Sequence, residues 1–303
     1  MNNDIISGIN RYKFLYLLLL PAVVYVFIFR YLPIYGLASA FLDYNYVQGI
    51  SGSTWVGFQH FQRLFGSSMF MDALKNTLII SSYKIISGLF CPVILAIMLS
   101  EIKQKWYQRT LQTVIYLPRF VSWVVYGGIV TLMLSPETGL INRIIEWMGF
   151  KPIYFLINPG YFRGLLVVTD ILKEAGWGAI IYIAAIAGID QQLYEAAIVD
   201  GASRLQRIFH ITLPGISTTI AVMLIIRVGY LLSAGLDQVI NLYNPMVLGV
   251  GDILDTYVYR EGIEKLNISL ATAAGLIQSV VGFALVLTAN KISKKINGSR
   301  AIM

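Results

Sequence analysis

The sequence predicts an all-α integral membrane protein that forms one domain with about six membrane-spanning helices. Of its 303 residues, 57% are hydrophobic and only 13% are charged, and the mean hydropathy is +0.68. A soluble domain normally carries about a quarter charged residues. The chain therefore has more apolar surface than one core can bury, and lipid must cover much of it.

Six segments are long and apolar enough to cross a bilayer, which takes about 20 mostly apolar residues. The predicted spans are 14–32, 76–99, 110–135, 164–188, 213–236 and 270–290. Arg11 and Lys13 precede the first span, as basic residues precede a signal peptide. However, the apolar run continues past Pro21 with no small-residue cleavage site, so we expect an uncleaved span.

The distribution of Lys and Arg among the loops predicts the orientation. The loops on one side are 1–13, 101–109, 189–212 and 291–303. They contain Arg11, Lys13, Lys103, Lys105, Arg109, Arg204, Arg207, Lys291, Lys294, Lys295 and Arg300. The opposite loops are nearly twice as long in total but hold fewer basic residues. We therefore expect both termini to be cytoplasmic, and the net charge of +7 needs no nucleic-acid partner.

The three segments expected outside the membrane, 34–75, 136–163 and 237–269, are long for loops. Loops of this length usually contain some structure of their own. They are candidates for docking a partner on the outer face, or they only cover the helix bundle.

The cytoplasmic segment 190–212 is polar and predicts a short helix. Asp190 can cap its amino end, and Gln191–Asp200 consists of good helix formers. Gly201 supplies the flexible residue that often follows a helix end. Ser203 can then cap a second short helix, and Pro214 suits the first turn of the next span.

The predicted short helix has a surface suited to a partner. Ala196 and Ala197 allow another surface to approach the backbone closely, and Glu195 offers a carboxylate to it. Such a helix fits a groove in another protein. A helix that only redirects the chain at the membrane surface is the alternative that the residues alone leave open.

The stretch from Glu195 to Pro214 resembles the EAA signature of permease subunits in binding-protein-dependent ABC importers. The matching residues are Glu195, Ala196, Ala197, Asp200, Gly201, Ala202, Ile211, Leu213 and Pro214. Further similarity, over nearly the whole chain, is to carbohydrate importers of the polysaccharide or complex-oligosaccharide type. It is carried by YLPRFVSWVV at 116–125, DILKEAGWGAIIYIAAIAGID at 170–190, LDQVINLYNP at 236–245 and DTYVYREG at 255–262.

The resemblance implies the type I ABC importer permease architecture, in which the EAA helix is the coupling helix seated in a cleft of a cytoplasmic ATPase. Glu195 would be the polar contact with the ATPase, and Gly201 would permit the turn after the helix. The implied partners are a second related permease in a heterodimer, two ATPase subunits and an extracellular sugar-binding protein. The implied location is a bacterial cytoplasmic membrane.

No catalytic residue, cofactor or metal is expected in this chain. It has no Gly-Lys pair and therefore no Walker A loop, so ATP and Mg would bind the separate ATPase. Cys91 is its one cysteine and has no partner for a disulfide or a metal site.

Charged residues inside the predicted spans are candidates for function. Each costs about 2.5–3.5 kcal/mol on insertion scales, so it should face a partner or a water-filled cavity. These residues are Lys84, Arg119, Asp170, Lys173, Glu174 and Arg227. Our candidates for lining a substrate pathway are Arg119, Asp170, Lys173, Trp177, Tyr230 and Asp237.

Spacing supports this choice but leaves an alternative open. Asp170, Lys173 and Trp177 recur at helical spacing, and Trp177 could offer a flat surface to a sugar ring. Tyr230 and Asp237 are seven residues apart and would share one face of the fifth span. The alternative is that Asp170 and Lys173 pair with each other, or with Arg119, and only hold the bundle together.

Three other functions are alternatives. An importer for phosphate, an amino acid or a peptide would also use an EAA helix. A secondary transporter could use Asp170, Lys173 and Glu174 as a proton relay, but the two halves of the chain show no similarity. A membrane-embedded enzyme would need a catalytic motif, and HExxH, GxSxG and CxxC do not occur in the sequence.

Overall fold

The computed structural model describes residues 12–297, with side chains for residues 12–291. It consists of two compact units, Met1–Gly66 with Arg260–Leu276 and Ser67–Tyr259 with Ile277–Met303. Each unit takes residues from distant parts of the chain, and the expectation of one permease domain stays a prediction. The basic residues Arg11, Lys294, Lys295 and Arg300 lie outside the described side chains, so the predicted cytoplasmic termini are not addressed by the structure.

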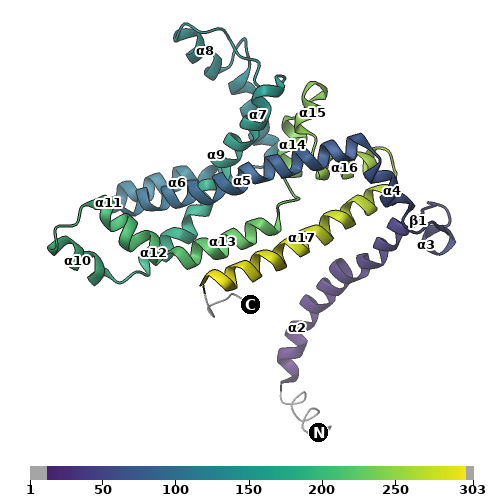
Figure 1. Cartoon of the computed structure of the whole chain (residues 1–303), viewed down its shortest axis with the longest axis horizontal. Coiled ribbons are helices and arrows are strands. Elements are labelled where there is room, and N and C mark those ends of the chain that lie inside the picture. Colours follow the sequence, from purple (N-terminus) through teal and green to yellow (C-terminus); the bar gives the residue numbers. More distant parts are fainter. Residues whose placement is uncertain (1–11, 298–303) are drawn as a thin grey trace. The chain divides into compact units, whose positions relative to one another are not determined.

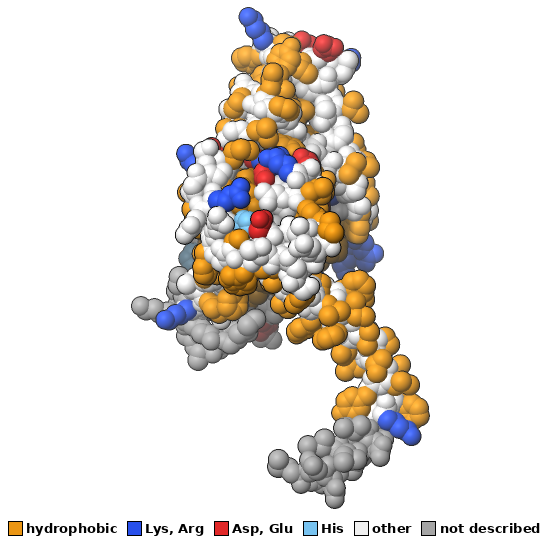
Figure 2. Space-filling model, turned by 90° about the vertical axis from the view of Figure 1, so that its right-hand side faces the viewer, with side chains coloured by type: hydrophobic (Ala, Val, Ile, Leu, Met, Phe, Trp, Pro, Cys, Tyr) orange, Lys and Arg blue, Asp and Glu red, His pale blue; other side chains and the backbone are white. Residues whose placement is uncertain are grey.

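The first unit begins with a helical segment that is apolar on all sides. It comprises α2 (Lys13–Val26), the π-helical turn η1 (Phe27–Tyr31) and the 3-10 helix η2 (Leu32–Phe41). Every residue of α2 and η1 is exposed, and Figure 2 shows hydrophobic side chains along this helix. A helix without a polar face is stable where lipid or another apolar helix covers it.

The rest of the first unit folds around a small two-stranded sheet. Its elements are β1 (Leu42–Asp43), α3 (Gly49–Gly52), β2 (Thr54–Trp55), α4 (Gln59–Phe65), η5 (Arg260–Glu264) and the start of α17 (Ile268–Asn297). The strands are antiparallel, with Leu42 opposite Trp55. The carbonyl oxygen of Leu42 accepts a hydrogen bond from Ser269 Oγ at 2.6 Å and lies 3.0 Å from Nε2 of buried His60. The expectation that segment 34–75 contains structure of its own is confirmed.

The second unit is a helix bundle built on α5 (Ser68–Ser100) and α9 (Pro159–Ala187), which pack side by side (Figure 1). Its other elements before the segment that carries the EAA residues, 190–214, are α6 (Lys105–Phe120), α7 (Trp123–Leu134) and α8 (Leu140–Trp147). After it come α13 (Ser217–Gly229), α14 (Leu236–Leu242), η4 (Pro245–Val247), α15 (Leu248–Gly251), α16 (Leu254–Tyr259) and the greater part of α17.

Two clusters of buried apolar side chains hold the second unit together. One joins α5, α7, α9 and α14 and includes Ile80, Val130, Leu166 and Val239. The other lies between α5, α9 and the residue just before α13 and includes Val93, Ala96, Ala179, Tyr182 and Ile216. Ile189 and Leu213, at the two ends of the segment that carries the EAA residues, pack against the second cluster.

Up to six segments among the described residues are long and apolar enough to cross a membrane. Three unbroken helical segments are long and apolar enough to span a membrane, Lys13–Phe41, Ser68–Ser100 and Ile268–Lys291. Three bent pairs also qualify when each is taken as one crossing. They are α6 with α7 at 105°, α9 with α10 (Gln191–Val199) at 72°, and Arg204–Gly215 with Ser217–Gly229 at 59°.

The segment predicted as a straight span at 110–135 is broken in the structure. α6 ends at Phe120 and α7 begins at Trp123. Between them, Val121 and Ser122 are extended, and the Ser122 side chain accepts a hydrogen bond from the amide of Val125. This serine cap starts a new helix in a new direction. Two shorter helices therefore replace the predicted one.

The span predicted at 213–236 also ends earlier than expected. α13 ends at Gly229, and α14 begins after Gly235, whose φ of +94° is a conformation that other residues rarely adopt. Tyr230 follows α13, whereas Asp237 lies in the first turn of α14. The prediction that Tyr230 and Asp237 share one helical face is therefore wrong.

Candidate functional site

The coupling segment, residues 190–214, begins with a short helix set at an angle to α9. The carboxylate of Asp190 accepts a hydrogen bond from the amide of Gln192 at 2.9 Å and caps α10. Gly201 has a φ of +79°, and the amide of Ala202 donates to the carbonyl of Ala197 at 2.8 Å, which closes the helix end. The predicted cap, helix and terminating glycine are thus confirmed.

A second short helix follows directly. Ser203 and Gln206 form a reciprocal capping box at the start of α11 (Arg204–Arg207), which confirms Ser203 as a cap. The chain continues through the π-helical turn η3 (Ile208–Thr212) into α12 (Leu213–Gly215). The hydroxyl of Tyr194 lies 2.9 Å from that of Thr212, so a hydrogen bond ties α10 to η3.

The outer surface of α10 is exposed. None of its residues is buried, and Glu195 and Ala196 both face outward. Leu193 and Ile198 are more than half exposed, and Val199 is 87% exposed. Contiguous apolar groups of this kind on a polar segment are typical of a surface that binds another protein.

The inner side of the coupling segment rests on the apolar cluster between α5 and α9. Leu213 and Ile189 pack against the buried side chains of this cluster, among them Ile216. Gly215 permits the close fit, because a Cβ there would lie 2.6 Å from Ile189 Cδ1. Pro214 is exposed within the first turn of α12. The coupling segment is thus anchored on the helices that form the bundle.

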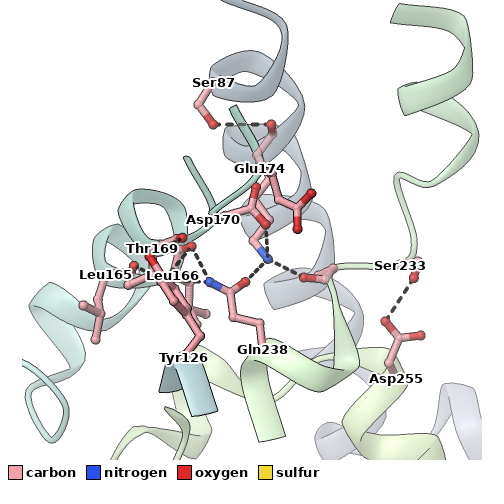
Figure 3. Close-up of polar contacts among 12 residues, drawn as sticks. Ser87, Tyr126, Leu165, Leu166, Thr169, Asp170, Glu174, Ser233, Gln238 and Asp255 are labelled. Carbon is pink, nitrogen blue, oxygen red and sulfur yellow. Dashed lines mark hydrogen bonds and ion pairs between the residues drawn. The ribbon is translucent and has the colours of Figure 1, made fainter. Parts of the chain in front are cut away.

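A second group of polar residues, which includes Asp170, Thr169 and Gln238, lies inside the bundle (Figure 3). Lys84 of α5 contacts two of them. Lys84 is buried, and its ammonium group donates to the carbonyl of Ala234 at 2.7 Å and to the side chain of Gln238. It also lies 3.5 Å from the carboxylate of Asp170 on α9. Lys84 therefore does not extend its charge to the membrane surface. It joins α5, α9 and the chain around Gly235.

Gln238 is the residue of this network that sequence reasoning missed. Its amide nitrogen donates to the carbonyl of Leu166 and to the hydroxyl of Thr169, both at 2.7 Å. Gln238 is fully buried, so each of these bonds replaces one that water would otherwise make. The sequence gives little signal for it, because Gln238 stands beside Asp237 and near Asn241 and does not differ from them in pattern.

The charged residues of α9 do not form the ion pairs expected from the sequence, in which Asp170 and Lys173 pair with each other or with Arg119. Asp170 pairs with Lys84, and Arg119 pairs with Glu174 at 2.8 Å. Lys173 forms no ion pair with Asp170, and it contacts Arg119 only at the backbone carbonyl. The hypothesis that Asp170 and Lys173 form an ion pair is therefore wrong, although both residues do hold helices together.

Lys173 instead caps the carboxyl end of α6. Its ammonium group donates to the backbone carbonyls of Pro118 at 2.9 Å, of Arg119 at 3.3 Å and of Val121. It also lies over the rings of Trp123 and Tyr126, 5.2 and 5.5 Å from their centroids. A cation is favourable at a helix carboxyl end and against aromatic faces. Lys173 thereby stabilises the 105° bend between α6 and α7.

The remaining pathway candidates lie in different places. Trp177 is half-exposed, and its ring packs edge-on against Phe120. Tyr230 is exposed and, with Asp170, lines a cavity of about 200 Å³. Asp237 is exposed on α14, and its backbone carbonyl accepts a hydrogen bond from Asn241. Of the six predicted residues, only Asp170 and Tyr230 line this cavity.

The residues that the structure describes contain no group of three His, Cys, Asp or Glu side chains able to hold a metal ion. The chemistry that the two sites offer is therefore of two kinds. One is an exposed helix with apolar and acidic groups, and the other is a set of buried charges between helices. Both suit a protein that moves a solute in response to a partner.

Comparison with known proteins now identifies the family. The family model for the binding-protein-dependent transport system inner membrane component matches residues 88–297, which include the whole coupling segment. The chain belongs to this family. It is a multi-pass membrane permease of an ABC importer that works with a binding protein, and it is not an enzyme, because a separate subunit hydrolyses ATP.

Several relatives of this permease resemble it along almost its whole length. Protein LplB of Bacillus subtilis (strain 168) is 44% identical over 95% of this chain and 91% of its own. The polygalacturonan/rhamnogalacturonan transport system permease protein YteP of the same organism is 42% identical over 93% of this chain and 88% of its own.

A solved structure is equally similar to the permease. It is a crystal structure of a bacterial alginate ABC transporter in complex with an alginate pentasaccharide-bound periplasmic protein. The matched chain is 42% identical, with a TM-score of 0.89 over 96% of this permease and 98% of that chain. The type I fold that the EAA resemblance implied is thus confirmed, and neither a secondary transporter nor an enzyme agrees with the family.

Proposed function

We propose that this permease imports oligosaccharides released from complex polysaccharides. The observation that carries the proposal is identity above 40%, along nearly the whole chain, to permeases named for polygalacturonan, rhamnogalacturonan and alginate transport. Uptake of another solute by the same type of importer is the alternative that a transport assay decides.

In this proposal the coupling segment transmits the work of ATP hydrolysis. α10 seats in a cleft of a cytoplasmic ATPase, with its exposed Leu193, Ile198 and Val199 in apolar contact and Glu195 as the polar contact. Gly201 allows the turn that brings Ser203 and α11 back toward the bundle. Closure of the ATPases pushes α10, and the push reaches the membrane helices through Leu213 and the cluster beneath it.

The proposed assembly contains a second, related permease, two ATPase subunits and an extracellular sugar-binding protein. The excess of Lys and Arg in the loops near the coupling segment supports a cytoplasmic position for that segment. The exposed apolar surface of α2 is available to lipid or to the second permease. ATP and Mg bind only to the ATPase subunits.

Purification of the tagged chain from its native membrane under mild conditions tests the assembly. We expect a second permease and an ATPase to be recovered with it. The recovered complex, reconstituted in proteoliposomes with its binding protein and internal ATP, should take up oligogalacturonate faster than phosphate, an amino acid or a peptide. Uptake of one of these other solutes alone would refute the carbohydrate assignment and leave the family intact.

A further inference from the structure

A polar cavity inside the second unit contains a cation that the coupling mechanism does not use. The cavity measures about 200 Å³ and lies between α5, α9 and the end of α13. Its polar lining consists of Ser81, Lys84, Asp170, Arg227, Tyr230 and Ser233. Lys84, Asp170 and Ser233 have side-chain partners within the bundle, whereas Arg227 has none among the described residues.

Two of the acidic residues near the cavity form ion pairs, and a third, Asp255, is bonded to neutral side chains outside the cavity lining. Lys84 pairs with Asp170, and Glu174 on the same helix pairs with Arg119. Asp255 does not line the cavity, and its carboxylate accepts hydrogen bonds from the side chains of Gln278 and Ser233. Among the residues that line the cavity, this leaves one net positive charge, on Arg227.

Arg227 is held in place without being paired. Within the described part of the chain its guanidinium group makes no hydrogen bond or ion pair, and its Nε is buried without a partner. The group fills space that two glycines leave open. A Cβ at Gly88 of α5 would collide with it, and one at Gly178 of α9 would touch it at 3.9 Å.

This arrangement is unfavourable unless an anion completes it. A buried donor without an acceptor is destabilising, and a charge inside a membrane span is more so. A guanidinium group presents parallel N–H donors that match the two oxygens of a carboxylate. We propose that Arg227 binds a carboxylate of the passing substrate, so that this permease is selective for acidic oligosaccharides such as those built from uronic acids.

The other groups of the cavity suit the rest of such a sugar. Ser81 Oγ is buried and has no hydrogen-bond partner within residues 12–291, so it is available to a sugar hydroxyl. Tyr230 and Ser233 are exposed at the same cavity and provide two further hydroxyl groups. A volume of about 200 Å³ is below the roughly 300 Å³ at which sites for drug-sized ligands begin, so it accommodates one ring at a time.

This inference rests on the proposed carbohydrate transport and is tested apart from it. The intact permease–ATPase complex, in lipid nanodiscs and without binding protein, is titrated with labelled trigalacturonate. Unlabelled trigalacturonate and its methyl ester then compete for binding. The ester keeps the sugar rings and lacks the charge but adds a methyl group at each carboxyl, so the change of the Kd ratio on replacing Arg227 measures recognition of the carboxylate.

We expect wild-type complex to bind the acid at least about tenfold more tightly than the ester, which corresponds to about 1.4 kcal/mol. In Arg227→Gln the ratio should fall to about one, while Arg143→Gln, at an exposed arginine of α8, should keep the wild-type ratio. A ratio does not depend on how much protein folds. If Arg227→Gln cannot be recovered, Gly88→Ala, which pushes a methyl group against the guanidinium, should lower the ratio instead.

Three outcomes would overturn the proposal. They are a wild-type ratio near one, no binding of either probe, and equal weakening of both probes by Arg227→Gln with the ratio preserved. The first is expected if an acidic residue of the second permease pairs with Arg227. Uptake of carbohydrate by the same complex would leave the proposed function standing in each of these cases, whereas failure of uptake would count against that function separately.

Discussion

Nζ of Lys84 on α5 lies 3.5 Å from the carboxylate of Asp170 on α9, and only about a tenth to a fifth of either side chain is exposed. The same ammonium group binds the carbonyl of Ala234, near the point where the chain turns at Gly235. One charged contact therefore joins three segments that are far apart in the sequence. The stability of the bundle depends on both partners being present.

The first prediction concerns this ion pair. Lys84→Met or Asp170→Leu alone leaves an uncompensated buried charge, which typically costs about 3–5 kcal/mol. The double variant removes both charges, so it should be more stable than either single one. Thermal denaturation of the detergent-solubilised protein, followed by fluorescence size-exclusion chromatography, measures the order. Glu174→Gln breaks a more exposed pair and should cost no more than about 1 kcal/mol.

Asp170 also lines the cavity, so it allows a second prediction. At equal amounts of folded complex, Asp170→Asn should change the ATPase activity that substrate stimulates, because an amide in the cavity alters the local charge seen by the substrate. The complex should remain assembled. A loss that is fully explained by a smaller amount of folded protein would show that Asp170 is only structural.

The third prediction tests the coupling helix. Glu195→Lys reverses the charge at an exposed position of α10, so the chain should insert and assemble while uptake falls by at least tenfold. Glu146→Lys makes the same charge change on the exposed side of α8 and should leave uptake unchanged. Both variants are compared by radiolabelled uptake at matched expression. Normal uptake by Glu195→Lys would remove Glu195 from its proposed role.

Gly201 provides a fourth prediction, because its φ of +79° excludes most side chains. Gly201→Val should strain the turn after α10 by about 1–2 kcal/mol, whereas Gly201→Asn should be tolerated better. Open space surrounds the missing Cβ, so any loss comes from the backbone and not from a collision. Hydrogen exchange of the coupling segment should increase in the valine variant. Equal exchange in both variants would contradict this.

The fifth prediction separates Lys173 from the pathway. Lys173→Met leaves the carbonyls at the end of α6 without their donor, so it should lower thermal stability, by an amount that corresponds to about 2–3 kcal/mol. Lys75→Met, at an exposed lysine of α5, serves as the control and should have little effect. The Kd ratio between trigalacturonate and its ester should not change in the Lys173 variant that remains folded.

Local patterns allowed prediction of the coupling segment but not of the interior. The caps at Asp190 and Ser203 and the turn at Gly201 depend on residues within a few positions of each other, so the sequence reveals them. The partner of Lys84 lies on another helix, and the partners of Lys173 are backbone carbonyls. The sequence does not show which acceptor each of these lysines contacts, because the acceptors lie far away in the chain or on the backbone.

The breaks in the membrane helices were missed for a related reason. Hydropathy is an average over about 20 residues, and it does not register two extended residues such as Val121 and Ser122. Nothing in the sequence marks Gly235 as the residue of positive φ that precedes α14 and lies between Tyr230 and Asp237. The number of crossings is therefore easier to predict than the path of each one.

The unbroken length of α9 determines how a small displacement at the coupling segment is magnified. Its 29 residues amount to a rod of about 43 Å at 1.5 Å per residue. If such a rod pivots by about 5° at the end next to the coupling segment, its far tip moves by roughly 4 Å. Asp170 lies 17 residues from that end of α9, so the same pivot moves it by roughly 2 Å relative to Lys84 on α5, which is more than half of their 3.5 Å separation. The ion pair that joins α5 and α9 in this conformation therefore lies where a small pivot of α9 can break it.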